Sequence, residues 1–213
     1  LADTYLSIIA DLSLMSHEYE LYQADPRSGT LMTLNVEALS PGTSFHPIAT
    51  DIKLRGTHLF KLNSVEPHQW VFGLRYGFST TVTSAKPEAT SILPAQYYQV
   101  LGGDNDLSGF GRYELNHGTL GANSSGFMGA EIRYAKSLPV WMEPFAFFDV
   151  GSLGQNVFAL NGALYTSAGL GLRLSTPFGA VRTTFAHGYV ANTDTGRDEL
   201  SHFQFFLSFG KEF

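Results

Sequence analysis

The sequence predicts an all-β protein, a transmembrane antiparallel up-and-down β-barrel of about eight strands with a long extracellular loop at 84–124. Three observations predict this fold. Apolar and polar residues alternate with a period of two in segment after segment. The polar faces combine charged side chains with glycines, as expected of a narrow, wet or ion-paired lumen. Short and long connections also alternate along the chain, which is typical of outer-membrane barrels and disfavours a soluble sandwich.

The composition agrees with a β-protein that hides large surfaces from water. The 213 residues are 14% aromatic and 15% charged and include 22 glycines. A net charge of −6 gives no basic footprint for nucleic acid, and the absence of cysteine excludes disulfides and thiolate metal sites. The sequence contains no run of about 18 apolar residues, so no membrane-spanning helix is predicted. No signal peptide opens the chain, which fits a cytoplasmic protein or a mature form.

The first three predicted strands cover 29–40, 51–63 and 69–83. Alternation is weak in the first two and strong in the third, where large apolar residues share one face and smaller or charged residues share the other. The apolar face of the third strand consists of Trp70, Phe72, Leu74, Tyr76 and Phe78.

Five more strands are predicted after the long loop, at 125–138, 143–152, 163–176, 179–189 and 201–213. Tight turns at 138–141 and 176–179 contrast with long loops at 84–124, 152–162 and 190–200. The short turns are expected at one rim of the barrel and the long loops at the other.

The N-terminal segment 1–28 is predicted to be separate from the barrel at 29–213. Within it, Tyr5 to Leu14 alternates like a strand and also fits a helical stripe. Three alternatives stay open: a ninth strand, a helix near the barrel mouth, or a segment that pairs with another chain.

From Gln96 onward the order of features resembles the C-terminal barrel of the superfamily that includes the assembly factor BamA and the two-partner-secretion transporters. The family's aromatic-x-Asp-x-Gly strand motif is matched by 147–151, and its closing aromatic strand by 201–213. The resemblance implies a barrel in the bacterial outer membrane that acts in membrane biogenesis. The family's long loop carries a Gly-Gly pair and an aliphatic-Arg-Gly-aromatic tetrad, matched here by Gly102, Gly103, Leu107, Ser108, Gly109 and Phe110.

Ser108 departs from the family pattern, because it stands where the family has the loop arginine. In the family, that arginine pairs in the lumen with the strand-motif carboxylate, which is Asp149 here. An unpaired buried carboxylate is costly, so we expect Asp149 to pair with another cation in the lumen. The candidates are Arg112, Arg133, Arg173 and Arg182.

The length of the chain is the second departure, since family members carry about twice as many strands and periplasmic client-binding domains. An eight-stranded barrel is only wide enough inside for its own side chains. We therefore expect the loop to lie outside, or two chains to associate and enlarge the enclosure, and we predict a homodimer.

The aromatic C-terminal strand implies recognition by the barrel-assembly machinery, because a final strand ending on an aromatic is the family's assembly signal. Its apolar face is expected to contact membrane lipid. The residues of this signal are Phe205, Leu207, Phe209 and Phe213.

The predicted function is protein insertion or translocation, or lipid binding or perturbation, without enzymatic activity, cofactor or nucleic-acid partner. One alternative is a structural or adhesive barrel whose long loops bind an external partner. Another is an outer-membrane lipid hydrolase that uses His187, although no nucleophile motif accompanies this residue. The other histidines lack ligand spacing, so no metal site is predicted.

Overall fold

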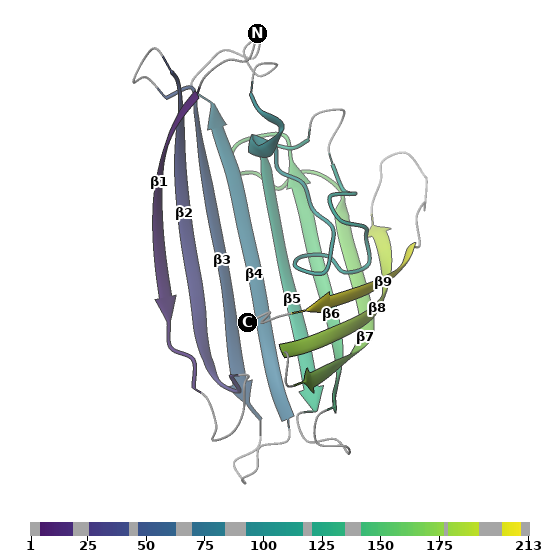
Figure 1. Cartoon of the computed structure of the whole chain (residues 1–213). Coiled ribbons are helices and arrows are strands. Elements are labelled where there is room, and N and C mark those ends of the chain that lie inside the picture. The colour runs from purple at the N-terminus through teal and green to yellow at the C-terminus, as the bar shows by residue number, and fades with distance from the viewer. Residues whose placement is uncertain are drawn as a thin grey trace.

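The computed structural model describes residues 5–18, 26–42, 47–62, 70–83, 93–116, 121–134, 142–176, 179–191 and 202–209. Nine strands form one sheet in which each strand pairs antiparallel with the next (Figure 1). The strands are β1 (Tyr5–Met15), β2 (Gly29–Pro41), β3 (Ala49–Lys61), β4 (Trp70–Thr83), β5 (Ser124–Tyr134), β6 (Met142–Gly154), β7 (Leu164–Thr176), β8 (Gly179–Ala191) and β9 (His202–Phe209).

The all-β, up-and-down prediction is confirmed, and the structure adds β1 to the eight strands that were predicted. Residues 5–15 of the N-terminal segment therefore form an extra strand, paired with β2 from Tyr5–Pro41 to Met15–Leu31. The predicted strand ends at 135–138 and 210–213 lie outside the described residues, as does the turn at 138–141. Among the described residues, no helix is long and apolar enough to cross a membrane.

The two faces of the sheet differ as the alternation predicts. On the outer face, large apolar side chains are exposed, including Leu170 and Phe185. On the concave inner face, buried polar and charged residues alternate with glycines. Several of these glycines lie beneath an aromatic ring of a neighbouring strand, such as Phe127 over Gly77. The glycines thus make room for rings and do not simply line a wet lumen.

The loop between β4 and β5 packs against the concave face of the sheet, which we call the inner wall. In Figure 1 the loop lies in front of the strands from β5 to β8. Of the two alternatives for the loop, the one in which it lies outside is therefore wrong for its described part. The buried cluster that joins loop and wall contains Leu101, Leu107, Phe110, Leu115 and Ala122 of the loop region with Leu153 of β6 and Val190 of β8.

The sheet has room for the loop because it is open. Among the described residues, β1 pairs only with β2 and β9 pairs only with β8. The narrow interior expected of an eight-stranded barrel applies only to a sheet that closes on itself. Because nine strands alternate in direction, β1 and β9 run the same way, and closing them on each other would require a parallel pairing.

Candidate functional site

The aromatic-x-Asp-x-Gly motif at 147–151 places Asp149 on the inner wall, where its side chain is fully buried. The Arg75 Nη2 donates to both carboxylate oxygens of Asp149 at 2.9 Å. The Ser167 hydroxyl donates to the same carboxylate at 3.1 Å, and the backbone N–H of Ser108 donates at 3.4 Å. A buried carboxylate with this set of donors is stabilised in its charged form. We call Arg75, Ser108, Asp149 and Ser167 the Asp149 anchor.

Arg75 links this carboxylate to the loop. Its Nη1 donates to the backbone carbonyl of Asp104 at 2.8 Å, and its Nη2 contacts the Ser108 hydroxyl at 3.3 Å. The loop position where the family has arginine is thus a buried serine, and the guanidinium comes from strand β4 of the wall.

The four arginines predicted to pair with Asp149 have other contacts, so that prediction is corrected. Arg112 pairs with Asp104 inside the loop at 3.2 Å. Arg182 and Arg133 lie at 2.8 and 3.6 Å from the carboxylate of Glu131. Arg173 is buried on β7, at a register position opposite Arg182 of β8.

The register of the sheet explains why Arg75 reaches Asp149. Arg75 lies opposite Gly129 in β5, and Gly129 lies opposite Asp149 in β6. A Cβ atom added at Gly129 would lie 2.8 Å from Nε of Arg75. The missing side chain on β5 therefore lets Arg75 cross that strand. The only sequence signal was the placement of Arg75 among the glycines of the inward face of 70–79.

The loop motif needs glycines because a side chain at these positions would strain the backbone or clash with the wall. Gly102 and Gly103 have φ of 113° and 124°, a region that residues with a side chain rarely adopt. A Cβ atom added at Gly109 would lie 2.5 Å from the Cα atom of Gly188 in β8. Loop and wall backbones are therefore in direct contact at Gly109 and Gly188.

The beginning of the loop has a second attachment, at the other side of the inner wall. Tyr97, in the 3-10 turn η2 (Ala95–Tyr97), donates its hydroxyl to Glu37 of β2 at 2.7 Å. Burial raises the pKa of Tyr97 to about 12, so the phenol keeps the proton that it donates. The Gln99 amide donates to Asp51 of β3 at 2.8 Å, and the Thr81 hydroxyl donates to the Tyr97 carbonyl at 2.5 Å.

The other predicted functional residues lie away from the loop. The ring of His187 packs edge-on against Phe203 of β9 at 4.7 Å between centroids. In the described part of the chain, no three His, Asp or Glu side chains lie close enough together to hold a metal ion. Three members of the C-terminal signal, Phe205, Leu207 and Phe209, are exposed on β9, while Phe213 lies outside the described residues.

Comparison with known proteins finds one family model and a solved structure of similar fold. The model of the Omp85 superfamily domain matches residues 22–213. The crystal structure of BamA from Haemophilus ducreyi lacking POTRA domains 1–3 resembles this chain with a TM-score of 0.66 at 16% sequence identity. The similarity covers 93% of this chain but only 41% of that one, and at this identity it concerns the fold alone. No curated protein sequence matches significantly.

Proposed function

The chain belongs to the Omp85 superfamily, and from this premise we propose that it acts in outer-membrane biogenesis, by inserting or translocating proteins or by binding and perturbing lipid. It is an integral β-barrel protein of the bacterial outer membrane. Its strands cross the bilayer, and the exposed apolar side chains of its outer face contact lipid.

The observation that carries the proposal is the edge of β1 that faces away from β2, with which no other described strand pairs. Across the 11 residues of this strand, all but the first are exposed. Apolar side chains extend from both of its faces, including Ile8 and Leu12 on the outer face and Ile9 on the inner face. A long, flat edge with unpaired backbone groups is a template for another strand. Within a membrane, an incoming strand satisfies backbone groups that lipid cannot.

A homodimer is the second part of the proposal. The loop already occupies the inner wall, so this sheet cannot close on itself as a narrow barrel around it. We propose that a second copy supplies the missing wall and covers the exposed apolar side chains of β1 and β9. Native mass measurement in detergent tests this. Two chains per particle are expected, and one chain per particle contradicts the dimer without affecting the family assignment.

The role in biogenesis is non-enzymatic in this proposal, and no cofactor takes part in it. The barrel-assembly machinery is the proposed partner during insertion of the chain itself, through the exposed aromatic side chains of β9.

Reconstitution into liposomes tests the biogenesis role. Liposomes with the protein are expected to fold an unfolded outer-membrane barrel faster than empty liposomes, and the gain is expected to fall when Ile9→Lys and Met15→Lys add charge to the inward face of the β1 edge. Lys61→Gln, on the inner face of β3, is the matched control. Equal folding rates with and without the protein contradict insertion. Lipid hydrolysis in the same liposomes would contradict the non-enzymatic role.

A further inference from the structure

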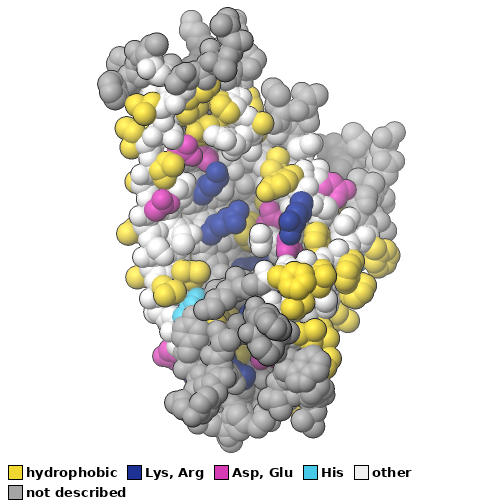
Figure 2. Space-filling view, viewed as in Figure 1, with side chains coloured by type: hydrophobic (Ala, Val, Ile, Leu, Met, Phe, Trp, Pro, Cys, Tyr) yellow, Lys and Arg dark blue, Asp and Glu magenta, His cyan; other side chains and the backbone are white. Residues whose placement is uncertain are grey.

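Three cavities between the loop and the inner wall share one residue, Arg55 of β3. The first has a volume of about 280 Å³ and lies below the loop tip at Asp104 and Asn105. The second, of about 480 Å³, separates the beginning of the loop from β3 to β5. The third, of about 210 Å³, lies between Arg55 and the loop residues 102–106. Figure 2 shows Lys and Arg side chains gathered on this concave face.

Arg55 differs from its cationic neighbours because it has no ion pair or hydrogen bond to its side chain among the residues that the structure describes. The neighbours each contact a carboxylate. Lys53 lies 2.6 Å from Asp51, and Arg75 and Arg182 pair with Asp149 and Glu131. Within the described residues, Arg55 is therefore the cation of the first cavity that no carboxylate contacts directly, and the charge of Asp106 acts on it only through space.

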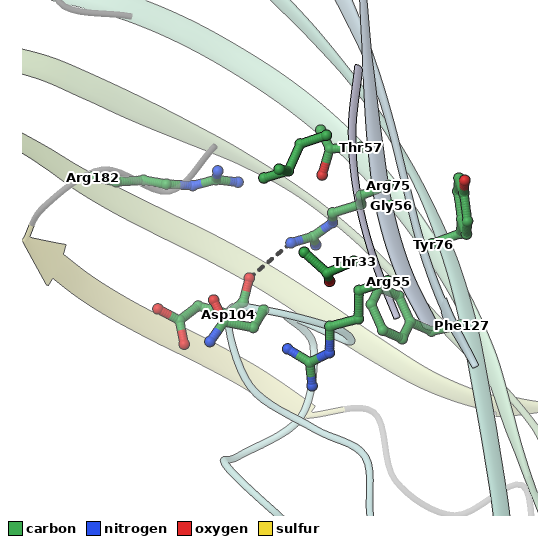
Figure 3. Close-up of a pocket in the computed structure, with 11 residues that line it drawn as sticks. Thr33, Arg55, Gly56, Thr57, Arg75, Tyr76, Asp104, Phe127 and Arg182 are labelled. Carbon is green, nitrogen blue, oxygen red and sulfur yellow. Dashed lines mark hydrogen bonds between the residues drawn. The ribbon is translucent and has the colours of Figure 1, made fainter. Parts of the chain in front are cut away.

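The groups around the first cavity are mostly hydrogen-bond donors. Figure 3 shows the side chains of Arg55, Arg75 and Arg182 directed toward the cavity from β3, β4 and β8. The hydroxyls of Thr33 and Thr57 also line it, and neither has a side-chain partner within the described ranges. The carboxylate of Asp104, the acid that lines this cavity, is paired with Arg112.

We propose that this cavity binds a phosphate group. Arg75 and Arg182 already donate to Asp149 and Glu131, so the guanidinium of Arg55 and the threonine hydroxyls are the donors offered to a ligand. Donors that approach from different strands match a tetrahedral oxyanion, which presents oxygens in several directions, better than a planar carboxylate, which one guanidinium fork satisfies. Arg55 supplies a guanidinium that no described carboxylate contacts directly, and the threonine hydroxyls donate to the remaining oxygens. The group comes from a lipid headgroup or from a soluble phosphate. This inference goes beyond the biogenesis role and does not depend on it.

Titration calorimetry of the full chain in detergent tests the proposal, with two probes at low ionic strength. One probe is inorganic phosphate, and the other is micelles doped with phosphatidylglycerol. Saturable binding of at least one probe is expected. Arg55→Gln is expected to weaken that binding about ten-fold or more, since one charge-assisted hydrogen bond is lost. The probe that responds to Arg55→Gln identifies the source of the phosphate group.

Lys61→Gln is the matched control, because it removes the same charge from the same face of β3, six residues away, where Lys61 pairs with Glu18. It is expected to leave the affinity unchanged. Heat-modifiable gel migration checks that each variant is folded, and Arg55→Lys and Thr57→Val replace Arg55→Gln if that variant does not fold. The proposal is overturned if neither probe binds saturably, or if Arg55→Gln and Lys61→Gln have the same effect.

Discussion

The pair of Arg75 and Asp149 is the contact on which the position of the loop depends most. Asp149 is fully buried and the Arg75 side chain is 14% exposed, so removing either partner leaves a buried charge without compensation. Arg75→Gln is expected to destabilise the folded protein by about 3 kcal/mol. The urea concentration at which heat-modifiable migration is lost measures this change.

Arg112→Gln is the control for that experiment. Its side chain is 63% exposed, and its pairing with Asp104 is largely screened by water. A shift of about 0.5 kcal/mol or less is expected. If the two variants lose the same stability, Arg75 has no special part in holding the loop.

Moving the arginine back to the loop tests whether Arg75 takes the place of the family's loop arginine. Ser108 is fully buried, so Ser108→Arg alone overfills the site and places two guanidinium groups at one carboxylate. In the double variant Arg75→Ser with Ser108→Arg, one arginine again faces Asp149. The double variant is expected to be more stable than the sum of the single effects predicts, by about 1 kcal/mol or more. Additive losses would contradict the exchange of roles.

We expect the stability of the loop to depend on pH through Asp106. Burial raises the pKa of its carboxyl, and the N–H donors of Leu107 and Gly102 and the charges of Arg55 and Arg75 offset only part of this. Because the folded-state pKa lies above the unfolded value, the stabilisation is full at acidic pH and is lost as pH rises through the raised pKa. Hydrogen exchange of amides 101–110, corrected for intrinsic rates, should therefore quicken with rising pH.

Asp106→Asn should remove that dependence, because the amide oxygen still accepts from Gly102 and Leu107 but does not titrate. An unchanged pH profile in this variant would assign the effect to another group.

At the scale of elements, the loop is fixed to β8 by direct backbone contact. Gly109→Ala places a Cβ atom 2.5 Å from backbone atoms of Gly188, which cannot yield as a side chain can. A loss of about 1–3 kcal/mol is expected from overpacking. Gly73→Ala is the control, because its nearest neighbour is a leucine methyl of Leu59 at 3.3 Å. Urea unfolding of both variants checks this, and equal losses would contradict the close contact.

The strands could be predicted from the sequence, whereas the attachment of the loop could not. Period-two alternation is a local signal, and it located β2 to β9 and offered β1 as one alternative. The partner of Asp149 depends on the register of β4 against β5, which are separated by the whole loop. No local sequence pattern predicts that register. Arg75 was therefore missed, and arginines closer in sequence to Asp149 were predicted as its partners.

The alternative that placed the loop outside was wrong for a different reason, at the level of the sheet. The expectation rested on the interior of a closed eight-stranded barrel, and the described sheet has nine strands and two free edges. The loop motif itself was recognised, and each of its residues is buried against the wall or turns where a side chain does not fit. The resemblance in sequence thus identified the residues of the loop motif but did not predict the open sheet against which they pack.

At the scale of the whole molecule, the protein is an outer-membrane sheet whose inner wall holds its own loop and whose two edges lack partners among the described strands. The wall supplies the charge that holds the loop, through Arg75, and the apolar cluster around Leu107 and Phe110 completes the contact. The Arg75 contact and the apolar cluster can form only if the loop stays on the inner wall when the protein is in the membrane.

Cysteine labelling in liposomes tests that claim most directly, because the chain contains no cysteine of its own. Leu107 is fully buried in the loop and Tyr113 is 73% exposed in the same loop. With a membrane-impermeant maleimide, Tyr113→Cys should label rapidly, while Leu107→Cys should stay unlabelled until Arg75→Gln is added. Rapid labelling of Leu107→Cys with Arg75 intact would contradict the account.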